Sequence, residues 1–228
     1  MKKIVIALLV TFGLTTIVSA EIGVKVGVSA QIGEMETSGK EVSSDGTTAT
    51  SEKEKALLGT AGFFIEKDLA FLPGPFGRLS IGFDNIVHDL DLGTQRNPRR
   101  ANLGAGGAVA IATDHSVEAK ITGFETLYAT LNLTDWLYVK GGTVTVDVDT
   151  KFNGTSTSSY AKNHSLDGTV LGFGVEKSSE NGMFFRLEYN DYSIDGKSVV
   201  NAGADSKFTA TLNDVSGSTG RISIGKAF

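Results

Sequence analysis

The 228-residue chain contains no cysteine, so any stability it gains outside the cytoplasm comes without disulfides. It has only three prolines, three histidines and one tryptophan. Beyond the first twenty residues, no apolar run is long enough to form a transmembrane helix. The formal net charge of −5 argues against nucleic acid as a partner. These absences leave an exported or membrane-spanning chain of the all-β kind to consider.

The N-terminus has the three parts of an export signal. Lys2 and Lys3 form a positive start, residues 4–18 are mostly apolar, and Val18-Ser19-Ala20 places small residues at a cleavage site. An N-terminal membrane helix is the alternative, but the segment is short for a span and ends in a cleavage pattern. We expect residues 1–20 to be a cleaved secretory signal peptide and residues 21–228 to form one domain.

The rest of the chain reads as eight segments in which apolar residues alternate with small or polar ones, as in β-strands. In the first, Ile22, Val24 and Val26 share one face, and Gly23 and Lys25 share the other. The eight segments cover approximately residues 22–32, 55–67, 76–87, 117–133, 136–149, 166–177, 183–194 and 221–228.

The connections between these segments alternate between short and long. Residues 68–75, 132–135 and 178–182 are short, whereas residues 35–54, 88–116, 150–165 and 195–213 are long and polar. The three prolines all fall in connections, where none interrupts a strand ladder. An even number of strands with this alternation predicts an eight-stranded antiparallel up-and-down transmembrane β-barrel with short periplasmic turns and long extracellular loops. Both mature termini then lie on the periplasmic side.

The strands of a soluble barrel or a sandwich also alternate apolar and polar residues, but their apolar face points inward and carries bulky residues. Here the opposite face carries glycine, serine, threonine and charged residues in nearly every segment, which favours the membrane interpretation. Two places break the pattern. Glu125 falls on the apolar face, which predicts a position at the membrane rim or a bulge at Gly123. The apolar parity changes across Gly141-Gly142, which predicts a bulge or a change of phase there.

Three stretches resemble a known family: residues 184–192 (FFRLEYNDY), residues 136–142 (WLYVKGG) and the terminal Phe228. Together with the export signal they are similar to the eight-stranded opacity-type outer-membrane proteins, which resemble the membrane domain of outer membrane protein A. The resemblance implies an outer-membrane location in a Gram-negative bacterium. It also implies that Ile222, Ile224 and Phe228 form the signal recognised by the barrel assembly machinery. Lys226 departs from the family, which usually has an aromatic residue there.

Charged side chains on the inward faces must be paired, because a buried unpaired charge is costly. Two functional interpretations of such a set remain open: an ion path gated by a switch among the pairs, or a plug that fills a narrow barrel. Eight strands leave an interior just wide enough for side chains to fill it, which favours the plug. The predicted lumen network comprises Lys25, Arg78, Asp84, Lys140, Glu176, Arg186 and Glu188.

No catalytic motif surrounds the three histidines, which are His88, His115 and His164. We therefore expect no enzymatic activity, no metal site and no cofactor.

A loop cluster of Arg96, Arg99 and Arg100 is a candidate site for lipopolysaccharide phosphates or an acidic receptor, although a solvated loop explains it equally simply.

The sequence predicts an outer-membrane barrel with a structural and surface-interaction role. Its expected partners are outer-membrane lipid and lipopolysaccharide, the assembly machinery and a surface receptor that binds the loops. A small solute channel is the first alternative, and a lipid-modifying enzyme is the second.

Overall fold

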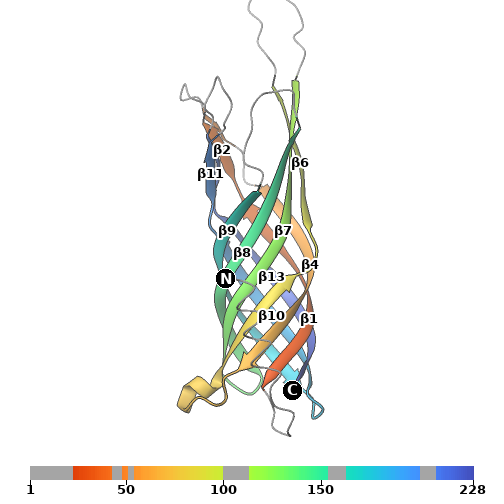
Figure 1. Ribbon diagram of the computed structural model, residues 1–228, viewed down its shortest axis with the longest axis vertical. Helices are drawn as coiled ribbons and strands as arrows, with labels where there is room; N and C mark the ends of the chain where they lie inside the picture. The colour runs from red at the N-terminus through yellow and green to blue at the C-terminus, as the bar shows by residue number, and fades with distance from the viewer. Residues whose placement is uncertain (1–22, 43–47, 51–53, 100–112, 154–162, 201–208) are drawn as a thin grey trace, which may run out of the picture.

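Eight antiparallel strands close into a barrel, which confirms the predicted fold (Figure 1). The computed structural model describes residues 23–42, 48–50, 54–99, 113–153, 163–200 and 209–228. In ring order the strands are β5, β4, β1, β13, β10, β9, β8 and β7, and β7 pairs with β5 to complete the circle. Their bounds are β1 Val24–Thr37, β4 Glu54–Asp68, β5 Leu79–Ile86, β7 Thr113–Asn132, β8 Leu137–Asn153, β9 Asn163–Ser178, β10 Met183–Ile194 and β13 Val215–Ala227.

The two ends of the barrel differ. At one end, named the short-turn end, strands are joined by residues 69–78, 133–136 and 179–182, and the first connection contains a 3-10 helix, η1, at Gly74–Arg78. Val24 and Phe228 pair through backbone hydrogen bonds of 2.8 and 3.3 Å. The amide of Ala227 also donates to the carbonyl of Gly182 at 2.8 Å. The first and last described strands therefore begin and end at the short-turn end.

At the opposite end, named the loop end, strands extend beyond the closed ring. Strand β6 (Leu90–Arg99) pairs with the outer half of β7, with a register irregularity between Asp91 and Thr94. A second sheet has the order β11-β12-β2-β3. Its strands are β2 Gly39–Val42, β3 Thr48–Thr50, β11 Lys197–Val200 and β12 Thr209–Leu212. Figure 1 shows β2 and β11 beyond the barrel mouth. The sequence predicts residues 35–54, 88–116 and 195–213 only as long polar loops, but parts of all three connections form paired strands.

The outer face carries the apolar band that alternation predicts. On β10, Phe185, Leu187 and Tyr189 are between 44% and 47% exposed. Towards the loop end the outer face of the same strand changes to polar residues, Asp191 and Ser193. Strand β9 changes in the same way, from Leu171 to Thr169, Asp167 and Ser165. The band therefore ends below the loop end, and the barrel wall continues past it with a polar exterior.

The two irregularities have different explanations. The register between β7 and β8 shifts between Ile121 and Gly123, which confirms the predicted bulge at Gly123. At Gly141-Gly142 the bulge prediction is wrong, because β8 pairs without a shift against both neighbours there. Even-numbered residues of β8 face inward from Tyr138 to Val148, so Lys140, Val144 and Val146 are all buried. Along β8 the side chains of both faces therefore change in polarity, while the same parity of residues continues to face inward.

No helix in the described ranges has the length and apolar character needed to cross a bilayer.

Candidate functional site in the barrel interior

The half of the interior nearer the short-turn end holds a group of ion pairs centred on Arg186 and Glu66. Arg186 donates two parallel hydrogen bonds to Glu66, Nη1 to Oε2 at 2.9 Å and Nη2 to Oε1 at 2.8 Å. Its Nε donates to Oε2 of Glu176 at 2.5 Å. Lys25 Nζ lies 3.2 Å from Glu176, 3.7 Å from Asp68 and 3.9 Å from Glu66. Bidentate geometry of this kind gives both strength and orientation.

A second group of ion pairs lies next to the first. Arg221 pairs with Asp84, and its Nε lies 3.4 Å from Glu188 Oε2. Lys140 Nζ lies 3.4 Å from the other oxygen of Glu188 and 4.4 Å from the centre of the Tyr128 ring. Tyr128 in turn donates from its hydroxyl to Glu66 at 3.2 Å, which links the two groups. We call these nine charged side chains and Tyr128 the lumen network.

Strand register brings several of these opposite charges together. Lys25 faces Glu66 across β1 and β4, Arg186 faces Glu176 across β10 and β9, and Glu188 faces Arg221 across β10 and β13. Directly opposed residues on one face of a sheet are close enough to pair. The bonds between Arg186 and Glu66 are different, because β10 and β4 are separated by β13 and β1 in the ring. That contact crosses the interior and exists only in the closed barrel.

Aromatic rings fill the space around the charges, and glycines make room for them. Phe64, Phe184, Tyr128 and Tyr138 each sit opposite a glycine on a neighbouring strand: Gly27, Gly225, Gly82 and Gly174, respectively. A Cβ atom at any of these glycines would lie between 2.3 and 2.6 Å from a ring atom of its partner. The Arg186 guanidinium lies within 4.9–5.4 Å of the ring centres of Phe64, Phe184 and Tyr138. The network is therefore packed between rings as well as paired.

The interior towards the loop end is apolar. Phe124 and Tyr192 meet edge to face with ring centres 5.6 Å apart. Val170 and Val144 are fully buried beside them, at 0% and 1% exposed. The complete cluster is Ile86, Phe124, Val144, Val146, Leu166, Val170, Tyr192 and Ile194. The interior thus contains a charged layer and an apolar layer, and side chains pack it at both levels.

Six of the seven residues predicted for the lumen belong to the network: Lys25, Asp84, Lys140, Glu176, Arg186 and Glu188. The prediction for Arg78 is wrong. Its side chain is exposed and donates to the carbonyl of Leu133 at 3.2 Å. Arg78 ends the 3-10 helix, and the strand begins one residue later at Leu79. Alternation does not apply to a residue outside the strand.

Three members of the network, Glu66, Asp68 and Arg221, were missed. The signal for each was present in the sequence. Glu66 and Asp68 lie on the opposite parity from Phe63 and Ile65, and Arg221 has the parity of Ser223. Applying the alternation to every charged residue of each strand finds all three.

The remaining candidate residues lie elsewhere. Arg96 and Arg99 belong to β6, and Arg100 lies outside the described residues, as does the predicted signal peptide. The imidazole Nε2 of His88 accepts a hydrogen bond from the Ala61 amide at 3.1 Å. Its Nδ1 lies 3.1 Å from the carbonyl oxygen of Asp89. Within the described ranges no group of three or more histidine, cysteine or acidic side chains has an arrangement suited to a metal ion.

Ile222 and Ile224 of the predicted assembly signal lie on the outer face of β13, each about half exposed. Phe228 follows the strand and is also half exposed, with Lys226 Nζ 5.4 Å from its ring centre.

Comparisons with known proteins support the fold. The sequence matches no family model and no curated protein. Among solved structures, the outer membrane protease OmpT from Escherichia coli aligns over 94% of this chain and 99% of its own, with a TM-score of 0.55 and 8% identity. Neisserial surface protein A aligns over 90% and 97%, with a TM-score of 0.41 and 12% identity. OprG from Pseudomonas aeruginosa aligns over 90% and 96%, with a TM-score of 0.43 and 11% identity. At 8% identity, the likeness to OmpT shows the barrel fold alone.

Proposed function

We propose that this chain is an outer-membrane β-barrel of a Gram-negative bacterium. Its interior acts as a structural plug, and its role is exerted at the surface by the strands and loops beyond the membrane. One observation carries the proposal: the apolar band lies outside the barrel, while paired charges fill the inside. A soluble barrel has the opposite arrangement, and a band of this kind is stable only in lipid.

The asymmetry of the two ends supports one orientation of the barrel in the membrane. Barrels of this class have short periplasmic turns and longer extracellular connections. We therefore assign the short-turn end, with Val24 and Phe228, to the periplasm and the loop end to the exterior. The second sheet and β6 then project outward, with the opacity-type family as the proposed affiliation. The proposed partners are lipid, lipopolysaccharide, the assembly machinery and a receptor bound through the loop end.

A plug is favoured over a channel because the lumen network reaches from wall to wall. Arg186 and Glu66 join opposite parts of the ring, and the apolar cluster adds a second layer. An ion crossing the barrel must displace both layers. The test is single-channel recording of the refolded protein in a planar bilayer, with folding shown by altered gel mobility before heating. A silent bilayer is expected, and discrete, reproducible openings would replace the plug with the solute-channel function.

The surface role is tested by removing the second sheet while keeping the barrel. In one variant, residues 39–50 and 197–212 are each replaced by a short glycine-serine turn. We expect this variant to reach the outer membrane and to fold, but to lose attachment of whole cells to surfaces that the wild type binds. Equal attachment by both proteins would contradict a role for this sheet. We propose no catalytic role, because no catalytic motif surrounds the histidines in the sequence and the His88 imidazole is engaged with backbone groups.

A further inference from the structure

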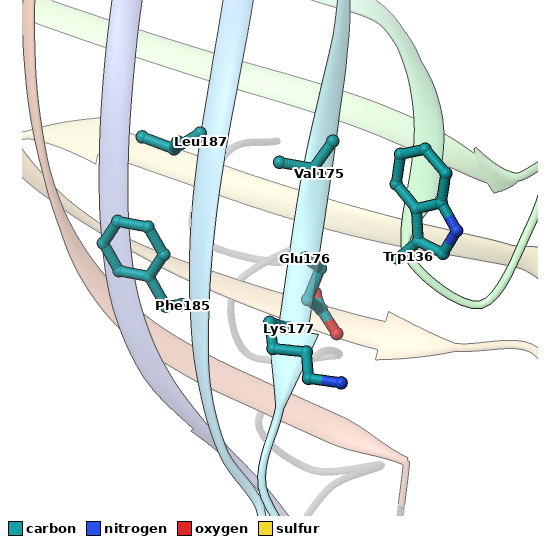
Figure 2. Close-up of a pocket in the computed structure, with 6 residues that line it drawn as sticks. All are labelled: Trp136, Val175, Glu176, Lys177, Phe185 and Leu187. Atoms are coloured by element: carbon teal, nitrogen blue, oxygen red, sulfur yellow. The ribbon is translucent and has the colours of Figure 1, made fainter.

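A shallow groove lies on the outer face of the barrel near the short-turn end (Figure 2). Figure 2 shows Trp136 on one side, Phe185 and Leu187 on the other, and Val175 and Lys177 between them along β9. The groove is open along the barrel surface and has a volume of about 410 Å³. It is part of the apolar band, and among its lining residues Glu176 belongs also to the lumen network.

Strand pairing holds the groove in shape. Leu187 faces Val175 and Phe185 faces Lys177 across β10 and β9. The carbonyl of Trp136 accepts a hydrogen bond from the amide of Glu176 at 2.8 Å, which fixes the start of β8 against β9. Two sides of the groove therefore belong to barrel strands, and Trp136, the last residue of the turn 133–136, is fixed to β9 by this bond.

The groove has one outward-facing charge. Glu176 also lines it, but its carboxylate is held by Arg186 at 2.5 Å and Lys25 at 3.2 Å in the interior. Lys177 is exposed, and in the part of the chain that the structure describes its ammonium forms no ion pair. Asp135 and Glu180 belong to the turns beyond the strand ends, and neither lines the groove. The result is an apolar trough with a single cation at its edge.

We propose that this groove binds an anionic phospholipid, with an acyl chain along Trp136, Val175 and Leu187 and the headgroup phosphate at Lys177. The proposal rests on the membrane location proposed above. Charge complementarity selects the occupant, because a headgroup phosphate supplies the anionic partner for the Lys177 ammonium. The groove also lies where the apolar band meets the turns, which is the level of headgroups and of interfacial tryptophan. A two-fold contact between two copies through this groove brings two Lys177 ammoniums together, which disfavours a second copy as the occupant.

Trp136 is the single tryptophan of the chain, so its fluorescence reports directly on this site. The full mature protein is refolded into vesicles of phosphatidylcholine and phosphatidylglycerol, and its insertion is verified by flotation and gel mobility. Quenching is then compared between vesicles in which one or the other lipid carries brominated acyl chains. We expect brominated phosphatidylglycerol to quench more strongly at equal mole fraction, giving a relative binding constant above one.

The variant Lys177→Ala lowers this preference about fivefold, the effect of one basic side chain near an anionic surface, and Lys177→Arg retains it. Lys67→Ala is the matched control, because Lys67 lies on β4, four strands from β9 in the ring. Equal quenching by both lipids, or an equal loss in both alanine variants, would overturn the lipid site. An inserted protein whose tryptophan neither lipid quenches would also overturn it and indicate a second copy in the groove. Failure to float with the vesicles would overturn the proposed membrane function instead.

Discussion

The guanidinium of Arg186 holds the carboxylate of Glu66 through two hydrogen bonds of 2.8 and 2.9 Å, although the residues are 120 positions apart in the chain. Both side chains are almost fully buried, at 4% and 1% exposed. The contact spans the interior between β4 and β10 and ties together strands that do not pair.

Glu66→Ala is expected to destabilise the barrel strongly. It leaves Arg186 with only Glu176, Lys25 with fewer carboxylates and Tyr128 without its acceptor. Removing one partner of a buried pair costs about 3–5 kcal/mol, because the other charge stays buried. Urea unfolding in lipid vesicles, followed by Trp136 fluorescence, measures the loss.

Glu34→Ala provides the control for that measurement. Glu34 accepts a hydrogen bond from Lys55 at 2.5 Å at the loop end, where both side chains are more than half exposed. This hydrogen bond, with the charge of Glu34, raises the pKa of Lys55 above its ordinary value. Exposed pairs contribute little, so we expect almost no change in unfolding. Equal effects of the two variants would show that the lumen network does not stabilise the barrel.

Glu188→Ala distinguishes a plug from a gate. Glu188 is the carboxylate between Lys140 and Arg221, so its removal takes away the carboxylate paired with the buried Lys140 and leaves Arg221 paired with Asp84. We expect lower stability in urea and no conductance in planar bilayers, because the apolar cluster still fills the barrel. New openings with unchanged stability would instead favour a switch among the ion pairs.

Gly27→Ala tests the pairing of aromatic rings with glycines. A Cβ at Gly27 would lie 2.6 Å from the Phe64 ring and 2.7 Å from the carbonyl oxygen of Ile224. Such overpacking costs about 1–3 kcal/mol in a tightly packed interior. Gly59→Ala on β4 is the matched control, since nothing lies within 4 Å of a Cβ placed there. The urea midpoint is expected to fall for Gly27→Ala alone, and a fall of the same size in both would contradict the steric explanation.

Phe228→Ala separates assembly in cells from intrinsic stability. Phe228 is half exposed, so little packing is lost when its ring is removed. We expect normal refolding into detergent but reduced accumulation in the outer membrane, measured by cell fractionation. The Lys226→Tyr variant, which introduces the aromatic residue usual at this position in the opacity-type proteins that the sequence resembles, is expected to accumulate at least as well as the wild type. Normal accumulation of Phe228→Ala would contradict the assembly role of the C-terminal residue.

The sequence alone determined the strands and the face on which most side chains lie. Alternation has a period of two, so local reading was enough to place Lys140, Arg186 and Glu188 inside the barrel. The same rule failed at Arg78 because a 3-10 helix occupies that position, and its turn geometry has no inward face. The change of polarity at Gly141-Gly142 also led to the prediction of a bulge, although the strand pairs there without a shift.

The tertiary structure alone decided which charges meet and where the polarity changes. The bonds between Glu66 and Arg186 depend on ring closure and stagger, which juxtapose residues from strands that never pair. In the same way, Val144 and Lys140 share the inner face of one uninterrupted strand. Val144 packs in the apolar cluster, whereas Lys140 pairs in the lumen network, and other strands contribute the partners of both. The strand to which a residue belongs determines whether its side chain points inward or outward. The stagger of the other strands around the barrel determines which side chains it contacts.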